Sequence, residues 1–510
     1  MTTKLTNHDQ YDRTLPDVKM VRDCVQGEFE IKRQGTKYLK HPDMIDQASE
    51  QARRRYAAYK DGAEFDDYPA DTLRSMLGAM TKGKSTIDLP DKIAHLEENA
   101  DGDGMPLIGL REVCYKNLLE VKFHILVAEM DSLQSLGVDD LYRDKKLSVA
   151  DLQRLNMKAT IKSYSRESLV DWDFRRINGV MQISLLMFEE TETIRDNDTL
   201  ISEDIVSRLV LGLDSNGQYY QKKYLKNKSG GFDSQEPFYP VVNGSRLNWV
   251  PAEIVTDEES PSGVIPAATG YIRAVCSASL ARYQVSADEK EAMRHMQPTL
   301  FAKGARQGDD ALFKELNGGR EHIAFGSGVA NVLPNNMEVE VIGLGAQTEP
   351  FENYYIRNDK KLASFGANVG GDSQQTKTAT QASSEASKRV AIMHSIVNNT
   401  ERAIQRMVSY CGMFMGLWSP EDVEAAIDNF EVNFPREFAS ERISPEEVAA
   451  INNLIMSGTY SKAEGVRMLV EGGFSVSDAE TILGEVEGQG PMPVQVAANT
   501  QQKEDSQEEN

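Results

Sequence analysis

The 510-residue sequence has no apolar run long enough to cross a membrane, since a spanning helix needs roughly 20 consecutive apolar residues. The first ten residues, MTTKLTNHDQ, are polar and lack the apolar core of a secretory signal. Hydrophobic residues make up 40% and charged residues 26% of the chain. We therefore expect a soluble globular protein with two or three domains and no membrane partner.

Cysteine and histidine are scarce. The four cysteines (Cys24, Cys114, Cys276, Cys411) lie far apart without a CxxC pair, which disfavours structural zinc or a disulfide framework and fits a reducing compartment. No two of the seven histidines have the spacing of metal ligands on a helix, and the sequence contains neither GxSxG nor HExxH. We expect no catalytic residue, metal or cofactor.

Acidic residues outnumber basic ones, and the formal net charge is -23. Such a chain repels phosphate overall, which argues against tight, sequence-specific DNA binding. It does not argue against a protein that surrounds DNA without holding it.

The first half predicts both helices and strands, and residues 1–50 are polar with sparse turn signals. Helices are predicted at 47–60 and 71–80, and the helical spacing of 107–130 grades into an apolar FHILVA run suited to a strand or a helix end. Alternating segments in 158–230 predict strands, with hairpin turns at Asn178-Gly179 and Asn216-Gly217. Residues 240–267, rich in Pro, Gly and Ser, predict a loop.

The second half is dominated by long helices. The pattern predicts helices at 268–298, 348–367 and 379–418, a β module at 299–347 with strands at 299–304, 322–328 and 337–345, several short helices in 419–487, and a disordered tail at 488–510. The fold class is therefore α+β, mainly helical.

The last long helix has apolar residues at steps of four and three. They are Ala386, Val390, Met393, Val397, Thr400, Ile404, Met407, Cys411 and Phe414. Such a regular stripe predicts a continuous apolar partner, either a core or a coiled-coil seam.

Two motifs resemble ligand sites but have the wrong context. Gly78 to Ser85 matches the P-loop pattern GxxxxGK[ST], yet a helical pattern precedes it and Pro90 follows closely, whereas a P-loop needs a strand before and a helix after. Asn99 to Gly104 resembles the start of an EF-hand loop, but Leu110 stands where the bidentate acid belongs. We interpret them as a helix end with a basic turn and as a polar turn.

The segment 368–378 is longer than an ordinary connection between two helices and contains glycines, amides and one lysine. One interpretation is a surface loop without a role. The other is a mobile loop in transient contact with a polyanion, at residues Asn368, Gly370, Gly371, Gln374, Gln375 and Lys377.

Several segments resemble the portal (head-to-tail connector) proteins of tailed bacteriophages, in the branch formerly known only as phage proteins of unknown function. The order of helix, β module, helix, glycine-rich loop and very long helix is shared. The matching segments are RRRYAAY, ENADGDGMPL, SLVDWDFRRINGV, SLARYQVSADEKEAMRHMQPTLFAKG, EPFENYYIRNDKKLASFGA and TATQASSEASKRVAIMHSIVNNTERAIQRMVSYCGMFMG. Together they cover most of residues 45–418, and the run 279–304 with LASFGA at 362–367 is the most specific.

The resemblance implies a division of the chain. It implies an α/β wing at 1–267, stem helices at 268–298 and 348–367, a clip at 299–347, a tunnel loop at 368–378, a long wing helix at 379–418 and a helical crown at 419–487. It also implies that Lys303, Arg306 and Arg320 of the clip contact the packaging motor or an adaptor.

The resemblance further implies a function: a dodecameric ring at one capsid vertex that passes double-stranded DNA during packaging and ejection. The implied partners are the terminase large subunit, major capsid and scaffold proteins, head-completion or adaptor proteins and tail proteins. The chain would be part of the virion, assembled in the host cytoplasm, and not an enzyme. The alternatives are another virion assembly protein or a P-loop nucleotide hydrolase. In a closed ring, basic groups of the stem helices on one copy could pair with acids on the next.

Overall fold

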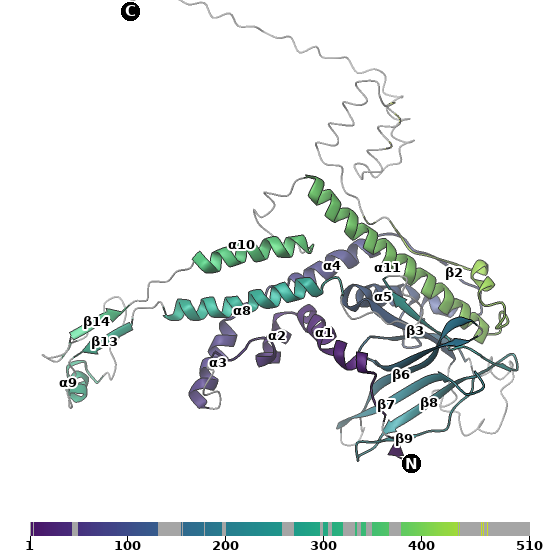
Figure 1. Ribbon diagram of the computed structural model, residues 1–510, viewed down its shortest axis with the longest axis horizontal. Coiled ribbons are helices and arrows are strands. Elements are labelled where there is room, and N and C mark those ends of the chain that lie inside the picture. Colours follow the sequence, from purple (N-terminus) through teal and green to yellow (C-terminus); the bar gives the residue numbers. More distant parts are fainter. Residues whose placement is uncertain are drawn as a thin grey trace, which may run out of the picture. The chain divides into compact units, whose positions relative to one another are not determined.

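The structure is a computed structural model of an α+β chain that divides into two units, Met1–Arg436 and Glu437–Asn510 (Figure 1). It describes residues 2–3, 5–42, 49–130, 155, 157–177, 179–195, 200–257, 270–295, 299–303, 309–319, 332–333, 338–342, 349–366 and 379–436, with single positions at 438, 461, 463 and 467.

A six-stranded antiparallel sheet forms the larger β layer of the first unit. Its order is β1 (Thr2–Thr3), β9 (Phe232–Ser234), β8 (Tyr219–Lys226), β7 (Ser202–Leu213), β6 (Val180–Arg195) and β5 (Leu169–Ile177). Both predicted hairpins are confirmed, since β5 pairs with β6 and β7 with β8. Gly217 has a φ of 72°, the left-handed value that makes glycine the favoured residue in such a turn.

A second sheet has the order β12 (Ala252–Thr256), β3 (Phe123–Met130) and β4 (Ala159–Tyr164). The FHILVA run is therefore a strand, because Lys122 adopts a left-handed conformation that ends the preceding helix. The predicted loop at 240–267 is wrong in part: β12 lies there, as does the small pair β10 (Val241–Val242) and β11 (Ser245–Arg246). Residues 252–256 form a strand because they pair with β3, which is more than 120 residues earlier in the chain, and the local residue pattern does not show that pairing.

The first fifty residues contain two helices that the sequence did not predict, α1 (Asp9–Gln26) and α2 (Glu28–Gln34). Helix α1 contains Pro16 and few apolar residues, so its own pattern is weak. It is held by tertiary contacts: the buried Arg166 guanidinium lies over the Tyr11 ring and donates to the Thr14 hydroxyl. Packing on the sheet thus compensates for poor local propensity.

The other predicted helices of the first half are confirmed as α3 (Glu50–Gly62), α4 (Tyr68–Thr81) and α5 (Leu107–Val121). Short 3-10 helices occur at η1 (Gly35–Lys37) and η2 (Ala94–Glu97). The short strand β2 (Thr86–Asp88) pairs with β15 (Glu431–Asn433).

The three predicted long helices are also confirmed, as α8 (Arg273–His295), α10 (Glu349–Ser364) and α11 (Ala379–Phe414). Between α8 and α10 the chain forms the antiparallel pair β13 (Thr299–Lys303) and β14 (Glu338–Ile342), together with a short helix α9 (Asp309–Leu316) that the sequence did not predict. The strand predicted at 322–328 lies outside the described residues. In the described ranges, no helix combines the length and apolarity needed to span a bilayer.

The stripe of α11 packs on the second sheet and on α5, as its regularity predicted. Its six central residues, from Met393 to Cys411, are all buried. Val390 and Phe414, near the ends, are half-buried. Each large apolar side chain buried in this way contributes about 1.5–3 kcal/mol relative to an exposed one.

Of the segment 419–487, predicted as short helices, the described part begins with a 3-10 helix, η4 (Ala425–Asn429), and then strand β15. The prediction is therefore wrong at 431–433, where pairing with β2 determines the structure. Nearly all of the remainder, and the tail at 488–510, lie outside the described residues.

Two helical glycines give opposite predictions for stability. A methyl group on Gly412 of α11 would overlap three ring atoms of Trp418, whose indole N–H donates to Ser409 O at 2.6 Å. We expect Gly412→Ala to lower the free energy of unfolding by about 1–3 kcal/mol. A methyl group on Gly78 of α4 would meet nothing within 4 Å. We therefore expect Gly78→Ala to raise the free energy of unfolding by up to about 1 kcal/mol. Urea unfolding measures both, and a stable Gly412→Ala protein would contradict the packing described.

His124 on β3 predicts a loss of stability in acid. Burial, with a smaller contribution from the Arg22 charge, lowers its pKa from 6.5 to about 3. The unfolded chain therefore binds a proton first, and the stabilisation present above pH 6.5 is lost as the pH falls toward 3. Between pH 7 and pH 5 this amounts to about 2 kcal/mol. In His124→Gln, the free energy of unfolding should fall by about 2 kcal/mol less between pH 7 and pH 5 than in the natural protein. An equal fall in both proteins would contradict the role given to His124.

Candidate functional site: the helix pair of α8 and α10

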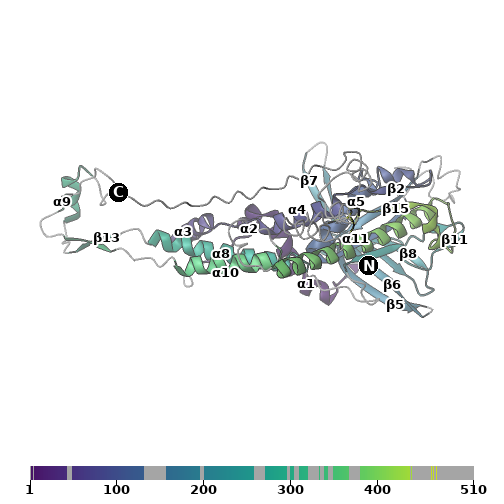
Figure 2. The ribbon, with the colours of Figure 1, turned by 90° about the horizontal axis from the view of Figure 1, so that it is seen from above.

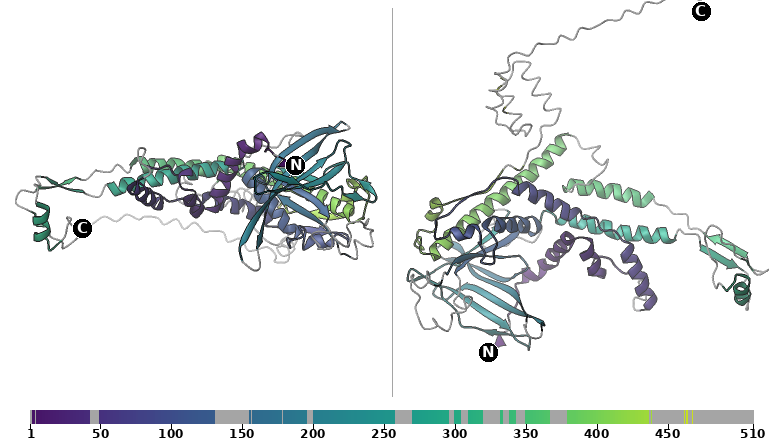
Figure 3. Two further views of the ribbon diagram at one scale, coloured as in Figure 1. Left: turned by 90° about the horizontal axis from the view of Figure 1, so that it is seen from below. Right: turned by 180° about the vertical axis from the view of Figure 1, so that it is seen from behind.

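Helices α8 and α10 pack side by side and run antiparallel (Figures 1 and 2), and the views from below and behind agree (Figure 3). Val275 and Ala278 of α8 are buried against Leu362 of α10. The Asn358 side chain donates to Ala278 O at 3.2 Å. Nearer the other end of α8, the Tyr355 hydroxyl donates to Glu289 at 2.6 Å, so the contacts run in opposite order along the two helices.

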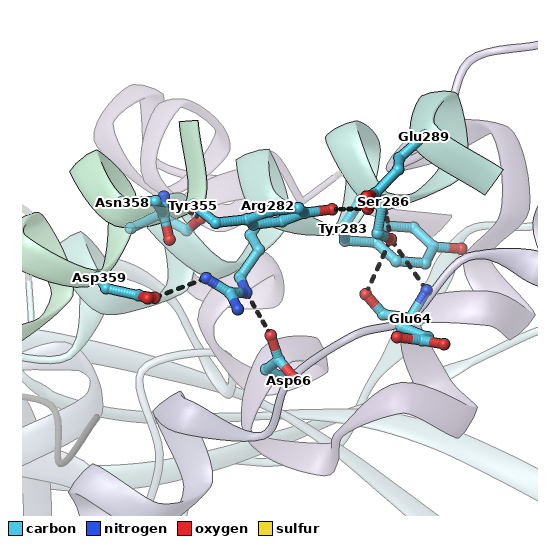
Figure 4. Close-up of polar contacts among 10 residues, drawn as sticks. Glu64, Asp66, Arg282, Tyr283, Ser286, Glu289, Tyr355, Asn358 and Asp359 are labelled. Carbon is cyan, nitrogen blue, oxygen red and sulfur yellow. Dashed lines mark hydrogen bonds and ion pairs between the residues drawn. The ribbon is translucent and has the colours of Figure 1, made fainter. Parts of the chain in front are cut away.

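Arg282 ties three segments together at the middle of this pair (Figure 4). Its Nε donates to Asp66 Oδ2 at 2.5 Å, and its Nη1 donates to Asp359 Oδ1 at 2.6 Å. The guanidinium also lies over the rings of Tyr68 and Tyr355. We call these five residues the Arg282 cluster. It joins α8 to α10 and to the connection between α3 and α4.

The Arg282 cluster is partly shielded from water, since the arginine side chain is 18% exposed. Burial alone would lower the pKa of Arg282, but the charges of Asp359 and Asp66 outweigh it and raise the pKa. The arginine thus stays charged. Its pair with Asp359, which is 26% exposed, is better shielded from water than its pair with Asp66, which is 42% exposed, and exposed pairs typically contribute only about 0.2–1 kcal/mol. The cluster therefore fixes the register of the two helices.

Helix α8 is also held by α3 and by the segment that follows α3. The Ser286 hydroxyl accepts from the Glu64 N–H at 2.9 Å (Figure 4), and Lys290 pairs with the Glu64 carboxylate at 2.8 Å. The Tyr59 hydroxyl donates to Asp288 at 2.5 Å. Helix α8 thus contacts both α10 and the N-terminal helices.

The chemistry of this region suits positioning. Burial and the hydrogen bond to Glu289 raise the pKa of Tyr355 well above its usual range, so the phenol stays neutral. Within the described ranges, no group of three or more His, Cys, Asp or Glu side chains could hold a metal ion. The ion pairs and packed apolar residues can hold two helices in a fixed arrangement.

Sequence reasoning allowed that stem-helix cations could pair with acids of a neighbouring copy, and the structure shows which acids within the chain the α8 cations pair with. Four cations of α8 pair within the chain: Arg273 with Asp17, Arg282 with Asp66 and Asp359, Lys290 with Glu64, and Arg294 with Glu291. Sequence reasoning placed Arg282 and Asp359 in the two helices but missed Asp66. The sequence points to Asp66 only through the acidic EFDDY run between two helices, and such a run does not show which cation Asp66 contacts.

The predicted contact residues are mostly untested by the structure. Asn368, Gly370, Gly371, Gln374, Gln375 and Lys377 of the predicted tunnel loop lie outside the described residues, as do Arg306 and Arg320 of the predicted clip. Lys303 lies in β13, opposite Glu338 of β14. The roles expected for these residues therefore stay predictions.

The two misleading motifs have the structures that we inferred. Gly78 lies inside α4, and only the three-residue strand β2 follows Ser85, so the segment lacks the strand and helix of a P-loop. In the acidic turn, Asp101 Oδ1 accepts from the N–H groups of Asp103 and Met105, and Asn99 caps Gly104. The side-chain oxygens of Asn99 and Asp101 are thus used within the turn, and Asp103 Oδ2 accepts from Lys162 of β4 at 3.3 Å.

Comparison with known proteins gives one family match and weak structural similarities. A family model described as "Domain of unknown function (DUF4055)" matches residues 275–415, which run from α8 to the end of α11. No curated protein matches significantly. A chain of the "Virion of native gene transfer agent (GTA) particle" aligns with 9% identity and a TM-score of 0.35, covering 86% of this chain and 98% of that one. A chain of the "Neck of empty GTA particle computed with C6 symmetry" aligns with 10% identity and a TM-score of 0.35, covering 79% and 90%.

The Arg282 cluster can be tested by a double-mutant cycle. Arg282→Ala and Asp359→Ala should each lower the free energy of unfolding by about 1–2 kcal/mol, because each leaves a partly buried charge without one partner. The double variant should lose less than the sum, with a coupling of about 1 kcal/mol. The control is Arg357→Ala, an exposed residue of α10 that lies outside the cluster and donates to Asn353 O of its own helix. Strict additivity would contradict the cluster.

Proposed function

We propose that this chain is the portal subunit of a tailed bacteriophage or a phage-like particle. Copies of it form a ring, expected to have twelve members, at one vertex of the capsid. The observation that carries the proposal is the antiparallel pair α8 and α10 with the strand pair β13–β14 inserted between them, followed by the 36-residue α11. The longest segments whose sequence resembles portal proteins lie over these same elements.

The helix pair suits the wall of a channel. DNA that moves through a ring exerts force on the helices lining it, so each subunit needs helices that cannot slide against one another. Within one copy, the Arg282 cluster and the Asn358 contact fix α10 on α8, and the Glu64 contacts fix α8 on the N-terminal helices. Because these ion pairs are internal, the wall of each copy is rigid before the ring assembles.

The charge of the chain suits the cargo. A net charge of -23 per copy makes a lumen that repels a duplex on average and lets it pass without tight binding. In this proposal, the segment 368–378 forms the narrowest point and the β13–β14 module contacts the motor and later the head-completion proteins. The chain itself performs no catalysis, since the terminase motor supplies the hydrolysis of ATP.

The acidic, helix-rich composition also suits another virion assembly protein, which is the second candidate. The two candidates differ in the symmetry of the oligomer and in whether it has a hole. A portal forms a closed ring with a channel wide enough for a duplex, whereas a scaffold or coat component does not.

Negative-stain microscopy of the purified protein tests the proposal. We expect closed rings, twelve-fold in top view, with a central channel that persists at low and high salt. Monomers or open filaments under every condition would overturn the proposal, and rings without a channel would favour the second candidate. Native mass spectrometry of the same sample gives the number of copies independently.

A further inference from the structure

Helix α10 presents a long exposed face on the side away from α8. Asn353, Arg357, Lys360 and Ser364 are all exposed. Successive residues of a helix are turned by about 100°, so these four lie roughly opposite Tyr355, Asn358, Asp359 and Leu362, which contact α8. We call the exposed side formed by these four residues the front face of α10.

The two flanks of α10 differ from the front face in chemistry. Ile356 lies on one flank and is 53% exposed. Phe365 follows the last residue of α10, lies on the other flank and is 39% exposed. Exposed apolar side chains on both flanks suit helices of the same kind placed on either side, as in a ring. Such a placement would leave the polar front face uncovered, with Arg357 and Lys360 along it and the exposed Glu349 at its N-terminal end.

The cations of the front face differ from those of α8. Four cations of α8 have a carboxylate partner in the same chain, but the structure gives none to Arg357 or Lys360 among the residues it describes. Arg357 Nε donates only to Asn353 O of its own helix, at 3.3 Å. Nearby, the Arg389 guanidinium of α11 lies against Gly366, just past the end of α10.

This geometry points to the following assignment, which rests on the proposed function: the front face of α10 lines the channel, and Arg357 and Lys360 contact the phosphate backbone of double-stranded DNA. Each copy contributes two cations one helical turn apart, so the ring presents a narrow cationic band on an otherwise acidic protein. Such contacts are independent of base sequence and weak one by one, which permits the duplex to move.

A duplex explains the front face better than a neighbouring copy does. A protein interface buries apolar residues at its centre, whereas the apolar residues here lie on the flanks and the centre is Asn353, Arg357, Lys360 and Ser364. Two cations flanked by small polar side chains match a phosphate backbone, which offers charge and hydrogen-bond acceptors but no apolar surface.

Binding of a DNA duplex to assembled rings tests the assignment. The probe is a fluorescent duplex of about 30 base pairs and mixed sequence, titrated with rings at several salt concentrations. The variant Arg357→Gln with Lys360→Gln should bind several-fold more weakly, and its salt dependence should be shallower by about one unit for each phosphate that is no longer neutralised. The matched control is Lys226→Gln with Lys228→Gln, which removes the same charge from exposed positions at the end of β8 and beyond.

We expect the control rings to bind as the natural rings do. Equal weakening by both variants would show that only the total charge matters and would overturn the assignment, and so would no weakening in the α10 variant. Microscopy of the same samples separates this result from the proposed function. If the natural protein forms no rings, the proposed function is wrong. If rings form and the α10 variant binds DNA as well as the natural protein does, only the assignment of the front face is wrong.

Photocrosslinking gives a second, direct readout. All four native cysteines are buried, so a cysteine introduced by Lys360→Cys can carry an azide photocrosslinker selectively. We expect crosslinks from position 360 to the DNA, and none from a control label introduced by Lys226→Cys. Crosslinks from position 360 to a second copy of the chain, with none to DNA, would overturn the assignment and identify the front face as a contact between copies.

Discussion

The salt bridges of Arg282 are the contacts on which the arrangement of α8 and α10 depends. One guanidinium joins Asp66, Asp359 and two tyrosine rings, so three segments far apart in the sequence meet at a single charge. Partial burial of the guanidinium strengthens these contacts, more for Asp359, which is 26% exposed, than for Asp66, which is 42% exposed. The cations of α8 have carboxylate partners within the chain. In the described part of this helix pair, the exposed cations that can bind another molecule therefore lie on α10.

The Arg282 cluster also connects the stability of the helix pair to the proposed function. The apolar contact of Val275, Ala278 and Leu362 is small and would allow α10 to slide along α8. Directional hydrogen bonds from Asn358 and Arg282 remove that freedom. A helix held in this way presents the same face in every copy, and a ring needs such uniformity if its inner surface is to be regular.

Elements with a strong local pattern could be predicted, and the rest could not. The stripe of α11 and the two hairpin turns are correct because each depends on residues close in the sequence. Helix α1 was missed because Arg166 and the sheet hold it, and β12 was missed because β3 makes it a strand. Helix α9 was missed because its eight residues are too few to show a period.

Residue patterns alone were enough to establish the α+β class, the three long helices, the order in which helices and strands follow one another, and the absence of a P-loop at Gly78. These follow from periodicity, turn residues and spacing, which act over a few residues. Three-dimensional packing was needed to establish that Arg282 pairs with Asp66, which side of α10 remains exposed, and that the strand β12 exists. Ion pairs and hydrogen bonds between strands form between groups that are close in space. The spacing of residues along the chain does not show which distant groups the fold brings together.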